Sequence, residues 1–490
     1  MLNTLRYLVL PVLNASGPVF VFLGLALLLP YVFSALENDG VKNSFLICSG
    51  LSFALGFLLS AVTRRYKREL TARHGFLLVT LIWTAVPLFS TLPFLIEMPE
   101  MSFAQLYFEM MSCLSTTGAT VINGLDQLPI SLNGWRCFLS WIGGMGLIVL
   151  SVAVLPLLGV GGSQIMKAEI SGPLKENRLT PRIADTAKAL YIIYLGLSFL
   201  CAFAYHTVGM SWADAIMHMM TTVSLSGIST HDASFAFFNS PFIDAVAVFF
   251  MILSGFNFSL HFLAWRRHSL RGYFGNTEAR TWVLILVVLS ALAAFVLFSK
   301  DVYGGWDETL RYAVFTAVSC ASSTGYSNTD YSLWPFGLPV ILMVCATFSS
   351  CAGSTGGGIK LIRLIITLKI LRREMIKLLY PKAVVPLTLD HSVLESKVGF
   401  AVLVFLQVWI LTFVCGAVLL LLSGLPPTEA ITSSLAMLSN LGPGLGSVGP
   451  AGNYSQLTVP QLWICSLLML AGRLEIFTVF VLFTKDFWKC

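Results

Sequence analysis

The sequence has few charged residues. Asp, Glu, Lys and Arg make up 11% of the 490 residues, whereas a soluble globular chain is roughly one quarter charged. Hydrophobic residues make up 56%, and the mean hydropathy is +0.81. This composition excludes an ordinary soluble domain. It indicates a membrane protein, whose chain is best divided into spans of about 20 apolar residues.

Metal-binding, nucleotide-binding and catalytic motifs are also lacking. None of the ten cysteines forms a C-x-x-C pair, and the seven histidines are scattered, so the pattern predicts no disulfide framework or zinc site. Gly353 and Gly358 have the spacing of a phosphate-binding loop, but Ile359 stands where that loop requires lysine. We therefore predict that the chain is not an enzyme, holds no covalently bound cofactor and binds a nucleotide only through a partner subunit.

One short stretch recurs along the chain. Leu114–Thr120 contains Ser-Thr-Thr-Gly, and looser copies follow at Val223–Ser229, Ala321–Ser327 and Leu438–Gly444. The aligned glycines are 109, 98 and 117 residues apart. Because internal repeats of one loop in one setting indicate a repeat architecture, we expect four loops around a common axis. Leu441 and Pro443 in the last copy indicate an uneven ring.

The loops lie in a repeated pattern of spans. Two leading spans come first, and then a long span, a half-length helix, the glycine loop and a second long span follow four times. The expected segments are Val19–Leu36 and Ser44–Val62; Gly75–Ile96, Ser102–Cys113 and Trp135–Leu158; Lys188–Val208, Trp212–Val223 and Phe242–Trp265; Thr281–Ser299, Trp306–Cys320 and the interrupted Leu338–Leu371; and Val398–Leu422, Thr428–Leu438 and Leu462–Phe483. Runs of about 10–14 apolar residues are too short to cross a bilayer and are typical of re-entrant segments.

The fold class that this pattern predicts is an all-α integral membrane protein. It has ten transmembrane helices and four re-entrant pore loops, built as four fused pore units behind two leading helices. The expected boundaries are residues 1–68 for the leading helices, then 69–166, 167–272, 273–382 and 383–490 for the four units.

The Lys and Arg residues give the orientation. If both termini are cytoplasmic, only Lys42, Arg136, Lys300 and Arg311 lie outside and Arg473 lies within a span, which leaves 25 of the 30 inside. This bias follows the positive-inside rule, so the net charge of +6 reflects membrane orientation and predicts no nucleic acid partner. All four glycine loops then enter from the outer face.

The loops have the chemistry of a cation filter. Each half-helix runs inward, so its C-terminal end, with about −0.5 charge, points toward the membrane centre. Glycine lets each loop turn its carbonyls toward the axis. Neutral carbonyls suit a large monovalent cation such as K⁺ better than Ca²⁺ or Mg²⁺. A single such loop would be ordinary turn chemistry, but four in one setting favour the filter.

These residues carry a resemblance. Each looped unit resembles the K⁺-channel pore unit. The chain throughout its length resembles the Trk/Ktr/HKT superfamily of potassium transporters, closest to the bacterial TrkH/TrkG membrane subunits. The stretches that carry this resemblance are Ser115–Thr120, Cys351–Lys360 and Ala471–Glu475. The resemblance implies K⁺ uptake across the bacterial inner membrane, a homodimer, and a cytosolic nucleotide-binding ring of the TrkA type. Potassium is then the only metal bound, through backbone carbonyls of Thr116, Thr117, Gly118, Leu225, Ser226, Gly227, Ser323, Thr324, Gly325, Asn440, Leu441 and Gly442.

A second site lies in the interrupted span. Four glycines and no bulky residue at mid-membrane disfavour a helix, and both this composition and the resemblance indicate a gate beneath the filter. The expected gate residues are Gly353, Ser354, Thr355, Gly356, Gly357, Gly358 and Lys360. The alternative is close helix packing through the G-x-x-x-G of Gly353 and Gly357.

Arg473 and Glu475 complete the predicted gate. Arg473 lies midway along Leu462–Phe483, where a buried arginine costs at least ~2.5 kcal/mol unless it is paired or hydrated. Facing the cavity below the loops, it would repel K⁺ and limit leakage. Glu475 lies on another helical face and is expected to pair with the gate. The alternative for both is a structural ion pair between helices.

Three questions stay open at this level. The basic run from Arg363 to Lys382 is a solvated inner face, a site for anionic lipid, or a docking surface for a cytosolic partner. The main functional alternative is an alternating-access symporter coupled to H⁺ or Na⁺, because broken helices also fit that class. Symporters of that class are built of inverted repeats, whereas these units run in one direction. A membrane enzyme would need a catalytic cluster that the inner ends lack.

Overall fold

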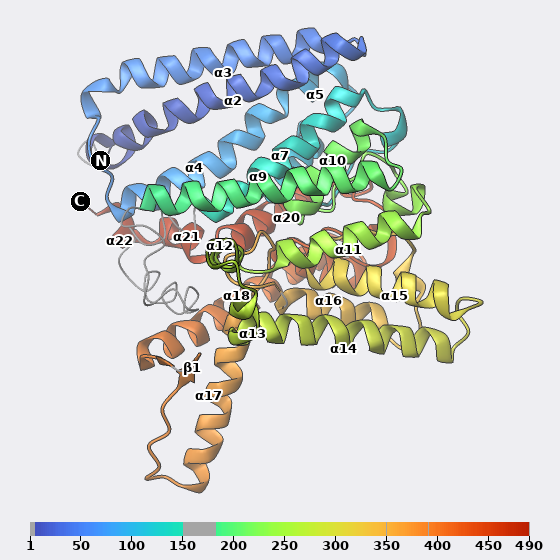
Figure 1. The fold of residues 1–490 in the computed structure, drawn as a ribbon. Helices are drawn as coiled ribbons and strands as arrows, with labels where there is room; N and C mark the ends of the chain where they lie inside the picture. Colours follow the sequence, from blue (N-terminus) through green and yellow to red (C-terminus); the bar gives the residue numbers. More distant parts are fainter. Residues whose placement is uncertain (1–4, 150–182, 349, 391, 490) are drawn as a thin grey trace.

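The chain folds into a bundle of helices that lie side by side, with both termini at the same end (Figure 1). The computed structural model describes all residues except 1–4, 150–182, 349, 391 and 490. The leading segment contains η1 (Leu5–Val9), α2 (Leu10–Glu37), α3 (Lys42–Val62) and η2 (Arg64–Tyr66).

Four groups of elements follow in chain order. The first is α4 (Ala72–Ser90), α5 (Leu92–Glu97), α6 (Phe103–Leu114), η3 (Leu125–Gln127) and α7 (Ile130–Val149). The second is α9 (Ile183–Thr207), α10 (Trp212–Val223), η7 (Ser234–Phe237), α11 (Pro241–Gly255), α12 (Phe258–Arg267) and α13 (Arg271–Gly275). The third is α14 (Thr277–Ser299), α15 (Trp306–Ala321), η8 (Tyr331–Leu333), α16 (Leu338–Phe348), α17 (Leu361–Leu379), β1 (Thr388–Leu389) and β2 (Ser392–Val393). The fourth is α18 (Ser396–Leu422), α19 (Pro427–Ser439), η9 (Gly446–Val448), α20 (Val459–Arg473), α21 (Phe477–Phe480), η10 (Val481–Phe483) and α22 (Lys485–Trp488).

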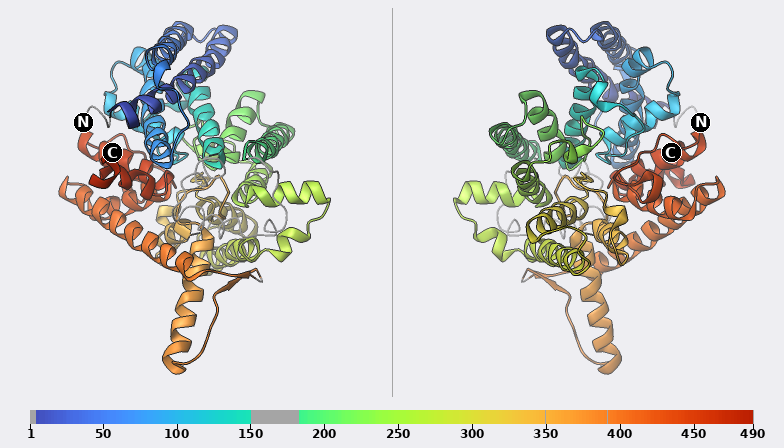
Figure 2. Two further views of the ribbon diagram at one scale, coloured as in Figure 1. Left: turned by 90° about the vertical axis from the view of Figure 1, so that its left-hand side faces the viewer. Right: turned by 90° about the vertical axis from the view of Figure 1, so that its right-hand side faces the viewer.

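The four groups are arranged around one axis. Each short helix packs against the long helices of its own group and against the last helix of the preceding one, in the pairs α10 with α7, α15 with α11, α19 with α16 and α6 with α20. The last pair closes the circle, and the end-on views show the four groups following one another around the centre (Figure 2). The short helices are therefore the inner layer. In α6, for example, every residue from Leu106 to Leu114 is buried or nearly so.

The number of membrane crossings stays a prediction. In the part of the chain that the structure describes, six helices are long and apolar enough to cross a bilayer, or up to eight if each bent pair is one span. The expected span Trp135–Leu158 runs past Val149, where the described part of α7 ends, and the expected boundary at 166/167 also lies outside the described residues.

Two spans expected to be continuous are broken. The chain bends by 93° between α11 and α12 and by 109° between α20 and the α21–η10 segment. At the first break the Asn257 side chain accepts the Ser259 N–H and starts a new helix, which is what asparagine does at a helix start. At the second, Glu475 and Ile476 both have positive φ, 56° and 51°. The expected spans Phe242–Trp265 and Leu462–Phe483 are thus each divided into two helices by a bend that the sequence did not predict, whereas the expected interruption of Leu338–Leu371 is present between α16 and α17.

The leading hairpin is fastened to the first group by Asp39, which lies in the turn between α2 and α3. Its carboxylate accepts the Ser131 backbone N–H at 3.1 Å and also the Ser131 and Ser34 hydroxyls. Ser131 lies in the first turn of α7, where a helix has free N–H groups and a partial positive charge. Asp39 thus holds the N-terminal end of α7 against the hairpin.

We predict that Asp39→Ala lowers the stability of the folded protein without changing its fold. Losing an acceptor at a helix N-terminus costs about 1–2 kcal/mol, which corresponds to a fall in Tm of roughly 1–3 °C in a chain of this size. Thermal unfolding of the purified protein in detergent measures this. Glu100→Ala, which removes an exposed carboxylate, is the matched control. Equal Tm values for the two variants would show that Asp39 does not fasten the hairpin.

Candidate functional site

All four short helices end in the same backbone conformation. The first residue of the loop proper is left-handed, with φ between 52° and 57°, and the glycine two positions later has φ between 72° and 93°. These left-handed residues are Thr116, Leu225, Ser323 and Asn440, followed by Gly118, Gly227, Gly325 and Gly442. In a strand, successive residues face opposite sides. Placing a left-handed residue at every second position cancels this alternation and turns successive carbonyls to one side.

Hydrogen bonds fix this conformation identically in each loop. The N–H that follows the left-handed residue donates to the carbonyl five residues earlier, at 2.9 Å in all four cases, as in a Schellman motif. The donor and acceptor pairs are Thr117 and Ser112, Ser226 and Thr221, Thr324 and Ser319, and Leu441 and Ala436. A left-handed residue other than glycine costs about 1–2 kcal/mol, and a bulky one such as Leu225 is an outlier. Repeated strain of this kind is typical of functional sites.

The loops touch one another in a closed ring. A Cβ atom added to Gly118 would lie 2.0 Å from the Ser226 carbonyl oxygen, and one added to Gly227 would lie 2.0 Å from that of Thr324. The series continues from Gly325 to Leu441 at 2.1 Å and from Gly442 back to Thr117 at 2.6 Å. Because no side chain fits at such distances, the four glycines are required for the carbonyls to approach. The fourth contact is the longest.

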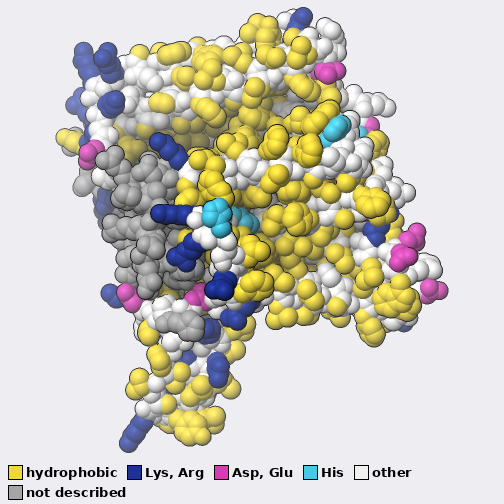
Figure 3. Space-filling model, in the orientation of Figure 1, with side chains coloured by type: hydrophobic (Ala, Val, Ile, Leu, Met, Phe, Trp, Pro, Cys, Tyr) yellow, Lys and Arg dark blue, Asp and Glu magenta, His cyan; other side chains and the backbone are white. Residues whose placement is uncertain are grey.

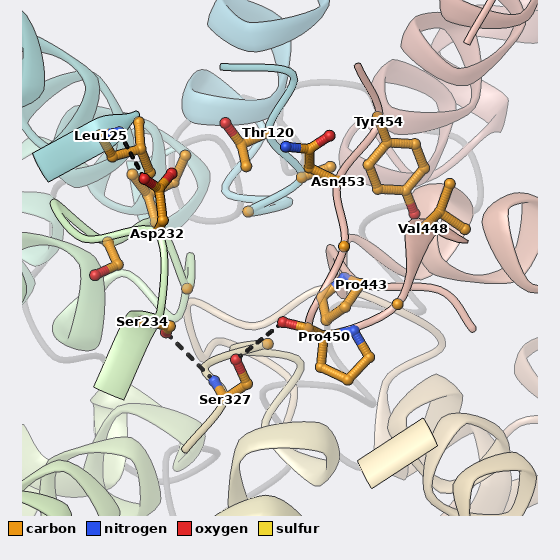
Figure 4. Close-up of a pocket in the computed structure, with 18 of the residues that line it drawn as sticks. Thr120, Leu125, Asp232, Ser234, Ser327, Pro443, Val448, Pro450, Asn453 and Tyr454 are labelled. Carbon is orange, nitrogen blue, oxygen red and sulfur yellow. Dashed lines mark hydrogen bonds between the residues drawn. The ribbon is translucent and has the colours of Figure 1, made fainter. Parts of the chain in front are cut away.

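The segments after the glycines interlock around the same axis and line a pocket above the ring (Figure 4). Each hydrogen bond joins neighbouring groups. The bonds run from Leu125 N–H to Asp232 at 3.1 Å, from Phe235 N–H to the Ser327 carbonyl at 2.9 Å, from the Ser327 hydroxyl to the Pro450 carbonyl at 3.3 Å, and from Tyr454 N–H to the Thr120 carbonyl at 2.9 Å. The pocket thus receives residues from all four loops.

A buried ion pair supports the first loop. Arg136 Nη2 of α7 lies 2.7 Å from Glu109 Oε1 of α6, and both side chains are at most 1% exposed. Glu109 also accepts the Val121 N–H at 2.8 Å, and Arg136 donates to the Ser229 carbonyl of the second loop at 3.2 Å. A buried pair is tolerated when further hydrogen bonds satisfy both charges, as they do here. The pair therefore ties the first loop to the second.

A second pair supports the third loop. Arg311 Nε of α15 donates to Asp244 Oδ2 of α11 at 2.7 Å, and Asn328 donates to the same oxygen at 3.0 Å. Neither Glu109 nor Asp244 was predicted from the sequence, and Arg136 and Arg311 had no predicted role beyond orientation. One feature of the sequence could have pointed to both carboxylates, because a charged residue inside an apolar helix usually has a function or a partner. Glu109, for example, stands nine residues before the repeated glycine Gly118.

The predicted gate segment lies directly beneath the ring. The Thr355 hydroxyl donates to the Val223 carbonyl at 2.9 Å, and the Gly357 N–H donates to the Ser323 hydroxyl at 2.8 Å. A Cβ on Gly357 would lie 2.3 Å from the Ser439 carbonyl oxygen. The segment thus contacts the inner ends of the second, third and fourth loops. Its backbone is not helical between Cys351 and Lys360, so the alternative of helix packing through Gly353 and Gly357 is wrong.

Arg473 and Glu475 occupy different places. Arg473, 2% exposed, donates from Nη1 to the Thr355 carbonyl at 3.0 Å and from Nη2 to the Gly143 carbonyl at 3.5 Å. It therefore lies at the end of α20 against the gate segment. Glu475 accepts from Arg363 Nη2 at 2.8 Å at the base of α17 and is 29% exposed. The Lys360 ammonium folds back onto the Gly356 carbonyl.

At the rim of the pocket above the ring, His231 lies between two carboxylates. Its Nδ1 is 2.5 Å from Asp126, and its Nε2 is 3.3 Å from Asp214. Burial by itself would lower the pKa of His231, but the hydrogen bonds to Asp214 and Asp126 outweigh it and raise the pKa above the ordinary value. A positive imidazolium is thus favoured at the rim of the pocket.

The fold and the site define a class before any relative is considered: a multi-pass membrane protein in which four similar groups enclose one axis. The TrkH family model, described as a cation transport protein, matches residues 42–489. The Trk system potassium uptake protein TrkH of Halomonas elongata is 41% identical to this chain, over 98% of this chain and 99% of its own length. TrkG of Escherichia coli (strain K12) is 32% identical, over 95% and 96%.

A solved structure agrees. The crystal structure of the potassium transporter TrkH from Vibrio parahaemolyticus matches with a TM-score of 0.90 and 37% identity, over 98% of this chain and 99% of that one. This chain belongs to the TrkH family, and the resemblance to the Trk/Ktr/HKT superfamily is confirmed. Since its relatives are named as transporters, the prediction that it is not an enzyme is also confirmed.

We predict a pH dependence of stability that originates at His231. Because its pKa in the folded protein is raised, the stabilisation is complete below the unfolded-state pKa of about 6.5 and is lost as the pH rises through the folded pKa. The Tm of the wild type should therefore fall on going from pH 6 to pH 9 by more than that of His231→Gln. Thermal unfolding over this pH series measures the difference, and parallel profiles for the two proteins would contradict it.

Proposed function

We propose that this protein takes up K⁺ across the bacterial inner membrane through the ring of four loops. The observation that carries the proposal is the closed series of glycine-to-carbonyl contacts from Gly118 through Gly227, Gly325 and Gly442 back to Thr117. The carbonyls of residues 116–118, 225–227, 323–325 and 440–442 form the selectivity filter in this proposal.

The chemistry of the ring supports K⁺ as the ion. The oxygens available there are neutral carbonyls and hydroxyls, which replace the hydration shell of a large monovalent cation in K⁺ channels. The four short helices end at this ring, and their C-terminal ends add partial negative charge close to its axis. The relatives are named as potassium uptake proteins, which agrees with the ion that the chemistry favours.

The gate in this proposal is the segment Gly353–Gly358 together with Arg473. The segment is buried and hydrogen-bonded beneath three of the four loops, so it stands in the path of an ion leaving the filter. Arg473 adds a positive charge at the same level. Glu475 acts one step away, by holding Arg363 at the base of α17.

The charge distribution supports the membrane orientation. Most of the Lys and Arg side chains visible in Figure 3 lie toward the end that carries both termini or on the projecting α17, while a broad hydrophobic face lies between the two ends. By the positive-inside rule this end is cytoplasmic. The termini are then cytoplasmic and the pocket above the ring faces outward.

The projecting α17 supports partner binding. It extends away from the bundle crosswise to the long helices, nearer to the end that carries the termini (Figures 1 and 2), and its exposed side chains combine large apolar groups with lysines and arginines. The apolar ones are Leu368, Leu371, Met375, Leu378 and Leu379. An exposed apolar surface of this kind marks an interaction site. We assign it to the proposed homodimer and to a TrkA-type nucleotide-binding ring.

One observation favours the second candidate, an alternating-access symporter coupled to H⁺ or Na⁺. The break in group two is hydrogen-bonded to the break in group three, from the Phe258 N–H to the Gly353 carbonyl at 3.1 Å, and Arg473, beside the break in group four, donates to the Thr355 carbonyl at 3.0 Å. Discontinuous helices at the midplane are typical of that class. A flux measurement of K⁺, Rb⁺ and Na⁺, with and without a proton gradient, separates the two. A channel-like filter gives flux that needs no second ion.

We predict that Gly118→Ala degrades K⁺ over Na⁺ selectivity, because its Cβ would displace the Ser226 carbonyl. Gly424→Ala is the matched control, since Gly424 also has positive φ but has open space around it. Ion competition of Rb⁺ uptake in proteoliposomes measures the selectivity. Unchanged selectivity in Gly118→Ala, with both variants folded, would remove the filter assignment.

We also predict that shortening Gly353–Gly358 by two residues raises K⁺ leak without any partner, because a shorter segment no longer reaches the inner ends of the loops. Rb⁺ efflux from liposomes holding only this protein measures the leak. Deletion of Gly304, in the open turn between α14 and α15, should leave it unchanged. If flux through the shortened protein stays dependent on a partner, the gate lies elsewhere.

A further inference from the structure

Glu278 holds both ends of the gate segment. It lies in the first turn of α14, is 3% exposed, and accepts the Ala352 N–H at 2.7 Å and the Ile362 N–H at 3.2 Å, both through Oε1. Ala352 precedes the glycine run and Ile362 lies in the first turn of α17. One carboxylate oxygen therefore holds together two backbone N–H groups that are ten residues apart, and this keeps the two ends of the segment close to each other.

The helix that carries Glu278 is itself held by the cytoplasmic hairpin of strands β1 and β2. Asp390, at the tip of that hairpin, accepts the Thr277 N–H at 3.0 Å and the Thr277 hydroxyl at 2.6 Å. Asn276, the N-cap of α14, donates to the same carboxylate at 3.4 Å. A carboxylate at a helix N-terminus is favoured by the helix dipole, so this contact fixes the position of the first turn of α14.

The hairpin is tied in turn to α17. Lys369 of α17 donates to the Thr388 carbonyl of β1 at 2.6 Å. Contacts thus run in a closed circuit from the gate segment through α17, the hairpin and α14 back to the gate segment. Glu278 makes the last contact, between α14 and the gate segment. A displacement of α17 or of its hairpin reaches the gate segment through Asp390 and Glu278.

We propose that Glu278 is a positioning residue that clasps the gate segment in its closed place, and that Asp390 couples this clasp to the projecting α17. The inference rests on the proposed function of the segment as a gate. Hydrogen bonds from backbone N–H groups to a carboxylate are about twice as strong as neutral ones, and burial strengthens them. When α17 moves, the hairpin shifts the first turn of α14, the clasp loosens and the segment leaves the underside of the ring.

The first test is Rb⁺ efflux from liposomes that contain only the purified protein. Glu278→Ala should raise the leak about tenfold or more, because it removes a charged acceptor shared by two donors. Glu278→Gln, which keeps an uncharged acceptor of the same shape, should raise it less. Asp390→Ala should raise it as well. Glu374→Ala removes an exposed carboxylate from α17 and should match the wild type.

A second readout follows the gate itself. Cys351 is 1% exposed at the start of the segment, so its modification by a charged thiol reagent, quantified by mass spectrometry of its peptide, reports movement of the segment. Modification should be faster in Glu278→Ala and Asp390→Ala than in the wild type or Glu374→Ala. In the protein with the shortened segment, Glu278→Ala should add no further leak, because residues that act through one element are not additive.

The outcomes separate this inference from the proposed function. If the shortened segment leaks but Glu278→Ala and Asp390→Ala neither leak nor expose Cys351, the clasp is overturned and the gate stands. If the protein with the shortened segment does not leak either, both the gate assignment and the role of Glu278 are wrong. Should Glu278→Ala not fold, the leak and the Cys351 modification of Glu278→Gln and Asp390→Ala separate the same two outcomes.

Discussion

Non-helical backbone inside a membrane must have its polar groups satisfied by protein or by a watery cavity, and the rest of the structure depends on how four loops meet this constraint. Each loop folds N–H groups back onto its helix and has a left-handed residue two positions before its glycine. The next loop approaches so closely that only glycine fits at the contact. The repeated glycine and the left-handed residue two positions before it therefore meet this constraint together. The left-handed residues are buried, and the surrounding protein keeps them in their strained backbone conformation.

The four loops share this backbone but differ in their supports. Glu109 and Arg136 hold the first loop, and His218, at the position equivalent to Glu109, lies 3.0 Å from the Ser229 hydroxyl in the second. Asp244 and Arg311 support the third. In the fourth, the Tyr454 hydroxyl donates to the Gly442 carbonyl at 2.9 Å. The four loops thus share one backbone conformation, although different side chains support each of them.

Local sequence signals predicted the parts of the fold that depend on local chemistry. Glycine recurring at intervals of 109, 98 and 117 residues indicated the loops, the short apolar runs indicated the inner helices, and the composition of Cys351–Lys360 indicated one break. The breaks at Asn257 and at Glu475–Ile476 were missed, because hydropathy averages over a single residue that starts or ends a helix. Glu109, Asp244 and Glu278 were missed because their partners lie 27, 67 and 74 residues away, a distance over which sequence pattern gives no pairing.

The central claim is that the ring of carbonyls binds a dehydrated monovalent cation on its axis. A crystal structure or cryo-EM map of the protein with Tl⁺ in place of K⁺ tests it most directly, because Tl⁺ is of similar size and scatters strongly. We predict Tl⁺ density on the axis between residues 116–118, 225–227, 323–325 and 440–442, abolished by excess K⁺ and kept in excess Na⁺. Tl⁺ bound elsewhere, with an empty axis at the ring, would contradict the claim.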